Sequence, residues 1–231
     1  MVTPVDRFSV AGRTACVTGA SGGLGRQCAD ALAAAGAAGI GVARREAALA
    51  DGAASGAGKR AYIAADLMDE AGLEALCDEI VAPFGTPDIL VHAAGVNLRQ
   101  PADEVTAEGW QQTLWLNLTV PFLLGQKLVP HMKQRGWGRI VNFASLQSSR
   151  AFPDGIAYGA SKGGVAQMTR AMAEAWSADG INANALGPGF FPTELTAPVF
   201  DDAERRARNA AQTCIGRNGR LEDVNGPLLF L

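Results

Sequence analysis

The sequence is poor in the residue types that build metal sites and covalent cross-links. It has only two histidines, His92 and His131, which are far apart in the chain. Its four cysteines are scattered without a CxxC pair, at Cys16, Cys28, Cys77 and Cys214. We therefore expect free thiols in a reducing compartment, and neither a disulfide framework nor a metal site.

Long apolar runs and blocks of like charge are also missing. The longest apolar run, residues 31–43, is interrupted by glycine and is too short to span a bilayer. The N-terminus lacks the charged-then-apolar layout of a signal peptide. The net charge is −3, and the short cluster of residues 204–208 follows two aspartates and predicts a solvated helix face. These absences predict a cytoplasmic protein that binds neither membranes nor nucleic acid.

What is present is a regular alternation of apolar runs and Ala-rich stretches. Strands are expected at residues 13–18, 38–43, 60–65, 87–92, 138–145 and 181–186. Helices are expected between them, including a long one at 106–134 that Pro121 should bend. Such alternation over 231 residues predicts an α/β fold: one Rossmann-type domain over residues 1–231, with a doubly wound parallel sheet and helices on both faces.

A glycine cluster follows the first expected strand and opens a helix. Its spacing, with Gly19, Gly23 and Gly25, leaves backbone N–H groups at a helix N-terminus, where a dinucleotide pyrophosphate binds. The alternative is a tight turn that needs glycine for steric reasons alone.

Two arginines and no acidic residue follow the second strand. An acid at this place bonds a ribose 2′-hydroxyl, whereas Arg44 and Arg45 suit a 2′-phosphate. The pattern favours NADP over NAD, and the alternative is a solvated loop.

Tyr158 and Lys162 are four residues apart, so they share one face of a helix. Ser145 precedes Tyr158 by thirteen residues, at the end of a predicted strand. A phenol beside an ammonium group has a stabilised phenolate and a lowered pKa, which suits proton transfer. The alternative is a half-buried helix tyrosine and a surface lysine.

Taken together, these motifs resemble the short-chain dehydrogenase/reductase family over nearly the whole chain. The shared motifs are a TGxxxGxG turn, an aspartate after the third strand, a helical asparagine, a serine, a YxxxK pair and a PGxxxT segment. The resemblance implies that the catalytic residues are Asn117, Ser145, Tyr158 and Lys162. It implies that NADP or NAD is held by Gly19, Ser21, Gly23, Leu24, Gly25, Arg44, Asp66, Leu67, Ala94, Gly95, Tyr158, Lys162, Pro188, Gly189, Phe191 and Thr193.

The same resemblance implies a role for each catalytic residue. Tyr158 is the general acid/base, and Lys162 holds the nicotinamide ribose and, together with the cofactor's positive charge, lowers the Tyr158 pKa. Ser145 stabilises the reacting oxygen, and Asn117 positions a water that links Lys162 to solvent.

The chain departs from the family pattern at two places. The family has Asn-Asn-Ala-Gly after the fourth strand, where this chain has His92 and Ala93 before Ala94 and Gly95. A side-chain hydrogen bond within the sheet is therefore expected to be lost. The sequence also stops at Leu231, before the last strand and tail that the family resemblance leads us to expect.

Several loop stretches look like the gluconate 5-dehydrogenase and 2-deoxygluconate dehydrogenase group of this family. They are residues 97–102, 144–146, 187–196 and 216–219. A small-molecule substrate of the sugar-acid or polyol class is implied, with Arg99, Gln147, Arg150 and Phe190 as candidate contacts and residues 190–208 as a lid. Phe152, Phe190 and Phe191 would alternatively suit a less polar ketone.

Other functions stay open at this point. The alternatives are a 3-oxoacyl-thioester or general carbonyl reductase, and a catalytically silent nucleotide-binding regulatory protein. The family resemblance also implies a homo-oligomer, a tetramer or a dimer.

Overall fold

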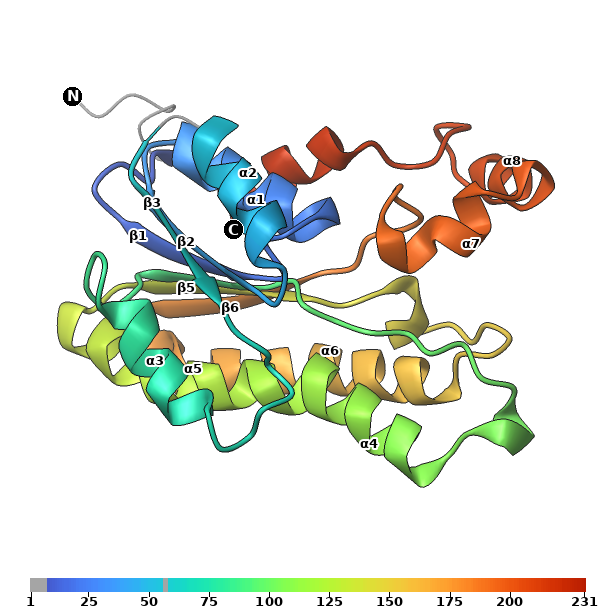
Figure 1. Cartoon of the computed structure of the whole chain (residues 1–231), viewed down its shortest axis with the longest axis horizontal. Helices are drawn as coiled ribbons and strands as arrows, with labels where there is room; N and C mark the ends of the chain where they lie inside the picture. Colours follow the sequence, from blue (N-terminus) through green and yellow to red (C-terminus); the bar gives the residue numbers. More distant parts are fainter. Residues whose placement is uncertain (1–7, 56–57) are drawn as a thin grey trace.

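The computed structural model describes residues 8–55 and 58–231, and it contains one six-stranded sheet (Figure 1). The strand order is β3-β2-β1-β4-β5-β6, and every neighbouring pair is parallel. The strands are β1 (Thr14–Thr18), β2 (Ala38–Ala43), β3 (Arg60–Ala64), β4 (Ile89–His92), β5 (Gly138–Phe143) and β6 (Ile181–Leu186). This is the doubly wound Rossmann arrangement, so the predicted fold class and all six strands are confirmed.

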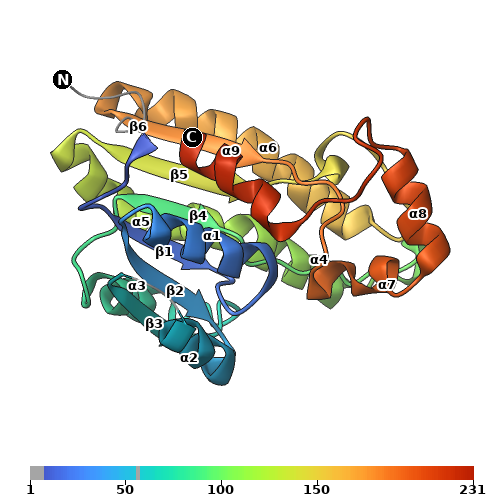
Figure 2. The ribbon, with the colours of Figure 1, turned by 90° about the horizontal axis from the view of Figure 1, so that it is seen from above.

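Helices cover both faces of the sheet (Figures 1 and 2). One face carries α1 (Gly23–Ala34), α2 (Glu46–Ser55) and α9 (Asn225–Phe230). The other carries α3 (Leu73–Val81), α4 (Ala107–Leu114), α5 (Val120–Arg135) and α6 (Ile156–Trp176). The short helices α7 (Ala197–Phe200) and α8 (Ala203–Ala211) project beyond the end of the sheet.

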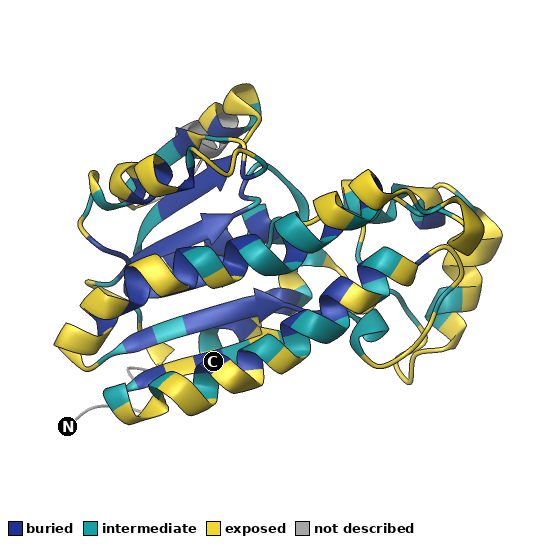
Figure 3. Ribbon diagram, turned by 90° about the horizontal axis from the view of Figure 1, so that it is seen from below, coloured by how far each residue is buried: buried dark blue, intermediate teal, exposed yellow. Residues whose placement is uncertain are grey.

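The alternation of side chains along the central strands divides the core into two clusters. Cys16 and Leu90 face the layer of α3, α5 and α6, whereas Val17 and Val91 face α1 and α9. Because both faces are covered, the strands are buried and the outer helix surfaces are exposed (Figure 3). Among the described residues, no helix combines the length and apolarity that crossing a membrane requires.

The long helix predicted at 106–134 is two helices separated by a π-helical turn (Trp115–Thr119). Pro121 lies in the first turn of α5, just after the helical residues of the π turn, and it has no backbone N–H to donate to them. The bend predicted at Pro121 stays a prediction. The interruption lies just before it, around Asn117, and π-helical turns of this kind are frequent at functional sites.

Candidate active site

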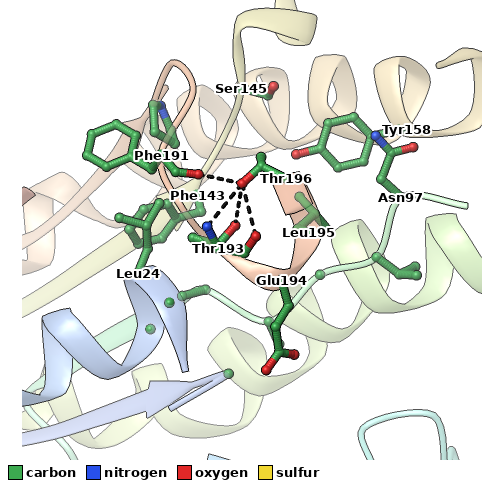
Figure 4. A pocket seen from close by; sticks show the side chains of 18 of the residues that line it. Leu24, Asn97, Phe143, Ser145, Tyr158, Phe191, Thr193, Glu194, Leu195 and Thr196 are labelled. Carbon is green, nitrogen blue, oxygen red and sulfur yellow. Dashed lines mark hydrogen bonds between the residues drawn. The ribbon is translucent and has the colours of Figure 1, made fainter. Parts of the chain in front are cut away.

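A cavity of about 770 Å³ opens where the strands end, between the sheet and the segment that leads into α7 and α8 (Figure 4). In doubly wound folds this is the edge of the sheet where ligands bind. Its lining includes every residue predicted to hold the cofactor: Gly19, Ser21, Gly23, Leu24, Gly25, Arg44, Asp66, Leu67, Ala94, Gly95, Tyr158, Lys162, Pro188, Gly189, Phe191 and Thr193. The structure thus brings together residues from most of the length of the chain.

The turn from β1 into α1 has no room for a side chain at two of its glycine positions. Gly19 has a left-handed backbone (φ 74°), and a Cβ there would lie 2.8 Å from the backbone nitrogen of Ala94. A Cβ at Gly25 would lie 2.3 Å from the Gly19 oxygen. The first residues of α1 therefore present backbone N–H groups at a helix N-terminus beside the cavity, and this cradle fits a dinucleotide pyrophosphate.

Tyr158 and Lys162 lie on one face of α6, and both are buried. The Lys162 ammonium donates a 2.5 Å hydrogen bond to the carbonyl of Phe143, the last residue of β5. It also lies 5.7 Å from the centre of the Tyr158 ring. The lysine is therefore a buried group beside the candidate acid/base, and the surface-lysine alternative is wrong.

Ser145 follows β5 and caps a short 3₁₀ turn. Its hydroxyl oxygen accepts from the Gln147 N–H at 3.1 Å, which leaves its own hydrogen free to point into the cavity. The Ser148 hydroxyl accepts from the Ser145 N–H at 3.2 Å and donates to the Lys162 carbonyl at 2.8 Å. Ser148 thus fixes the loop that carries Ser145 to the helix that carries Lys162.

Asn117 lies behind the cavity and does not line it. Its Oδ1 accepts from the Val96 N–H at 2.8 Å, and its Nδ2 donates to the Val96 carbonyl at 2.9 Å and to Ser161 Oγ at 3.0 Å. A Cβ at Gly95 would lie 3.1 Å from that Oδ1. The amide fixes the loop after β4, and its link to a relay water stays a prediction.

Burial dominates the electrostatics of the pair on α6. It raises the pKa of Tyr158, and the Ser145 hydroxyl and the charge of Arg99 lower that pKa by less. In this structure the cation that lowers the Tyr158 pKa is Arg99, and the lowering expected from Lys162 together with the cofactor's positive charge stays a prediction. Burial also lowers the pKa of Lys162 to about 8.

Three of the four predicted substrate residues line the cavity: Arg99, Gln147 and Phe190. Arg150 does not line it. Its guanidinium lies 6.0 Å from the centre of the ring of Phe152, which does line the cavity. A contact between Arg150 and the substrate stays a prediction.

Two aromatic rings form an apolar part of the wall. Phe152 and Phe190 meet edge to face, with ring centres 6.2 Å apart at 77°. The cavity lining also contains a charged side chain, that of Arg99. The backbone of Arg99 is left-handed (φ 52°), and its Nη2 donates to the Leu195 carbonyl at 3.2 Å.

Several lining residues were missed by sequence reasoning. They are Asn97, Gln112, Asp154, Glu194, Arg205, Arg208 and Asn209. Asp154 had a local signal, because it lies between Pro153 and Gly155 in a turn pattern and has a left-handed backbone (φ 56°). Asn97 lies in a loop stretch already singled out, and Glu194, Arg205 and Arg208 lie in the predicted lid, although none of the four was named as a site residue. Gln112 and Asn209 reach the cavity through tertiary packing that no short pattern encodes.

The departure at His92 has the predicted structural effect. The ring is buried, and neither of its nitrogens has a hydrogen-bond partner within residues 8–55 and 58–231. Burial lowers its pKa to about 4, so the imidazole is neutral.

Comparison with known proteins gives a consistent result. The model of the short chain dehydrogenase family matches residues 13–204. The chain is 37% identical to gluconate 5-dehydrogenase of Gluconobacter oxydans (strain 621H), covering 98% of this chain and 90% of that protein. It is 38% identical to 2-dehydro-3-deoxy-D-gluconate 5-dehydrogenase of Bacillus subtilis (strain 168), covering 98% and 89%.

A solved structure extends this similarity to three dimensions. The gluconate 5-dehydrogenase of Burkholderia cenocepacia J2315, in complex with NADP and tartrate, is 35% identical. It superposes with a TM-score of 0.90 over 99% of this chain and 91% of that one. The chain therefore belongs to the short-chain dehydrogenase/reductase family and is an NAD(P)-dependent oxidoreductase that acts on CH–OH groups.

Proposed function

We propose that this enzyme interconverts a secondary alcohol and a ketone on a sugar acid, with NADP preferred over NAD as the hydride acceptor. The relatives named above support a sugar-acid substrate, and the NADP in the Burkholderia structure supports that cofactor. We further propose that one domain, residues 1–231, carries both the cofactor site and the catalytic residues.

We propose a catalytic role for each of three side chains, and their positions support these roles. The nicotinamide supplies or accepts the hydride when it is bound. The Tyr158 hydroxyl gives a proton to the reacting oxygen or takes it away, and the Ser145 hydroxyl hydrogen-bonds the same oxygen. The Lys162 ammonium stabilises the Tyr158 phenolate and is held in place by the Phe143 carbonyl.

The observation that carries the substrate class is the position of Arg99. Its charge acts on the Tyr158 hydroxyl, so it lies within electrostatic reach of the reacting centre. It has no carboxylate partner among the described residues, and one of its nitrogens is anchored on the Leu195 carbonyl. A cation held in this way suits a substrate carboxylate, which pairs with a guanidinium through charge-assisted hydrogen bonds.

The test compares D-gluconate with D-glucitol, which keeps the secondary alcohols and lacks the carboxylate. Hydrogen bonds to charged groups contribute about 1.5–3 kcal/mol, so Arg99→Gln should lower kcat/KM for gluconate by roughly 10- to 150-fold. The same variant should leave the slow oxidation of glucitol unchanged. Arg150→Gln is the matched control, and it should stay within about twofold of the unmodified enzyme because Arg150 lies outside the cavity.

Equal kcat/KM for gluconate and glucitol in the unmodified enzyme would contradict the sugar-acid proposal.

The second candidate is reduction of a 3-oxoacyl thioester or another apolar ketone, which the Phe152–Phe190 wall favours. A 3-oxoacyl (acyl-carrier-protein) reductase from Agrobacterium tumefaciens C58 with NADP bound superposes with a TM-score of 0.88 at 28% identity. Faster NADPH oxidation with an acetoacetyl thioester than with 5-ketogluconate would favour that reading. Binding of NADPH without turnover on either substrate would favour a regulatory protein.

Assembly and location complete the proposal. Phe122 of α5 and Ile156 of α6 are exposed apolar side chains (40% and 51%), which supports a homotetramer or dimer that buries these helices. Light scattering coupled to size-exclusion chromatography tests this, and a monomer at micromolar concentration would contradict it. We place the enzyme in the cytoplasm, where its four free cysteines would stay reduced.

A further inference from the structure

Arg45 and Glu194 meet across the mouth of the cavity. Arg45 follows β2, and Glu194 begins the 3₁₀ turn (Glu194–Thr196) that leads into α7. Arg45 Nη1 donates to Glu194 Oε1 in an ion pair, and its Nε and Nη2 lie 3.3 Å and 3.0 Å from Ser21 Oγ. One guanidinium therefore joins the glycine-rich turn, the loop after β2 and the segment before α7.

The pair lies beside Gly22 of the glycine-rich turn, and its Arg45 is one of the two arginines that are predicted to hold the 2′-phosphate. A Cβ at Gly22 would lie 3.2 Å from Arg45 Nη2 and 3.8 Å from Glu194 Oε1. The Glu194 side chain points away from Tyr158 and Ser145, so it serves no part of the proton-transfer site (Figure 4). Arg45, Glu194 and Ser21 all line the same cavity as Arg44.

The ion pair between Arg45 and Glu194 is exposed to solvent and therefore weak, so another anion can replace Glu194 on Arg45. The side chains of Arg45 and Glu194 are 50% and 76% exposed, and such pairs contribute about 0–1 kcal/mol. A phosphate group carries more negative charge than a carboxylate and accepts two parallel hydrogen bonds from one guanidinium. A phosphate that reaches Arg45 therefore competes successfully with Glu194.

We propose that Glu194 sets the cofactor selectivity of this enzyme, because its carboxylate competes with the 2′-phosphate of NADP for Arg45. A cofactor without that phosphate leaves the Arg45–Glu194 pair intact and does not meet this competition. Glu194 therefore weakens NADP(H) binding relative to NAD(H) binding. The inference rests on the proposed use of NADP, and it does not depend on the identity of the substrate.

The test measures dissociation constants, with no substrate present. NADPH and NADH binding are followed by nucleotide fluorescence, and adenosine 2′,5′-bisphosphate and 5′-AMP by calorimetry. Loss of an exposed ion pair of up to about 1 kcal/mol corresponds to a change of roughly three- to fivefold. Glu194→Gln should tighten NADPH and adenosine 2′,5′-bisphosphate by about this factor, and should leave NADH and 5′-AMP within about twofold.

A double-mutant cycle identifies the partner. In an Arg45→Gln background, where Arg44 still contributes a charge, Glu194→Gln should change NADPH affinity by less than about twofold. Glu204→Gln on α8 is the control for loss of an exposed carboxylate nearby, and it should leave both nucleotides unchanged.

Two results would overturn the inference: an unchanged ratio of NADPH to NADH affinity in Glu194→Gln, or equal tightening with and without Arg45. Sugar-acid turnover is measured separately on the same preparations. Its absence, together with the expected binding changes, would remove the substrate proposal and leave the role of Glu194 in place.

Discussion

His92 of β4 and Asn142 of β5 are register partners in the middle of the sheet, and each has buried polar atoms without a partner among the described residues. Asn142 donates to Thr169 Oγ1 at 2.9 Å and lies 3.6 Å from Met172 Sδ, which leaves its Oδ1 without a hydrogen bond. Register partners in a parallel sheet point to the same face, so the imidazole shares the layer of α6. The centre of this sheet therefore contains two unsatisfied polar side chains, and unsatisfied buried groups of this kind reduce stability.

The first prediction concerns stability at low pH. Burial lowers the pKa of His92 in the folded protein to about 4, whereas an unfolded histidine titrates near its ordinary value of about 6.5. As pH falls, the unfolded chain binds the proton first, so stability is full above about pH 6.5 and is lost as pH falls toward 4. The loss is about 1.4 kcal/mol per pH unit, and roughly 3 kcal/mol in all. His92→Asn should remove this part of the pH dependence, as measured by urea unfolding between pH 7.5 and 4.5.

The control is His131→Asn, because His131 is exposed on α5. It should keep the full slope below pH 6.5. A slope in His92→Asn equal to that of the unmodified protein would show that other groups control acid stability.

The second prediction is that Lys162→Met makes the protein more stable and inactive. Burial lowers the Lys162 pKa to about 8, so holding the ammonium inside the protein costs free energy at pH 7. Stability should therefore rise with pH between about 8 and 10.4 in the unmodified protein, where only the unfolded lysine stays charged. The variant removes that cost and loses the bond to the Phe143 carbonyl, so we expect a net gain of roughly 1–2 kcal/mol in the free energy of unfolding. Denaturant unfolding at pH 7 measures it.

Lys133→Met supplies the comparison, since Lys133 is an exposed lysine paired with Asp179 at 2.7 Å. It should change stability by less than about 1 kcal/mol. A destabilised Lys162→Met protein would mean that the Phe143 hydrogen bond outweighs the burial cost.

The third prediction separates chemistry from binding at Tyr158. General acid/base catalysis contributes about 10²–10⁴-fold, so Tyr158→Phe should lower kcat by at least about 100-fold. NADPH affinity should stay within about threefold, because the ring and its packing remain. The chain has one other tyrosine, Tyr62, which bonds Arg60 at 3.3 Å outside the cavity, and Tyr62→Phe should keep full turnover. Turnover in Tyr158→Phe close to that of the unmodified enzyme would remove Tyr158 from the mechanism.

The fourth prediction concerns the end of the sheet opposite the cavity, where the strands begin. Asp88 is buried just before β4 and accepts from the Thr14 N–H at 3.0 Å and from Arg135 at 2.8 Å, with Arg13 at 3.6 Å. Asp88→Ala removes the acceptor of the buried Thr14 N–H and breaks ion pairs with two partly exposed arginines, so it should cost about 1–3 kcal/mol. Its kcat at 15 °C should be unchanged, because the site lies at the other ends of the strands. Asp179→Ala, which breaks an exposed pair, should cost less than about 1 kcal/mol.

The fold was largely predictable because its rules are local. Residues 38–43 and 181–186 were predicted as strands with the bounds that the structure has, since apolar runs between turn residues are read directly from the sequence. The doubly wound parallel sheet followed from the alternation of strands with helices, whereas the order of the strands was not predicted and comes from the structure. The π-helical turn at Asn117 was missed, because a residue pattern with period 3.6 does not reveal one inserted residue.

The parts of the site that come from one sequence motif were predictable. The parts that the tertiary fold assembles from single, distant residues were not. Tyr158 and Lys162 come from one helix face, so their proximity was expected. Arg45 and Glu194 are 149 residues apart, and nothing near either one indicates the other. The burial that raises the pKa of Tyr158 was not predicted either, because burial depends on the whole fold.

The π-helical turn between α4 and α5 also has a geometric consequence. One residue of an α-helix corresponds to a rotation of about 100°, so an extra residue in the ladder sets the side chains before and after it out of phase. The π turn thus lets the buried face of α5 point toward the sheet while Asn117, in the same continuous helical segment, points toward the loop after β4. A one-residue deletion at Leu118 would restore a uniform helix. The protein could then keep either Leu124 and Leu128 of α5 buried or the hydrogen bond between Asn117 and Val96, but not both.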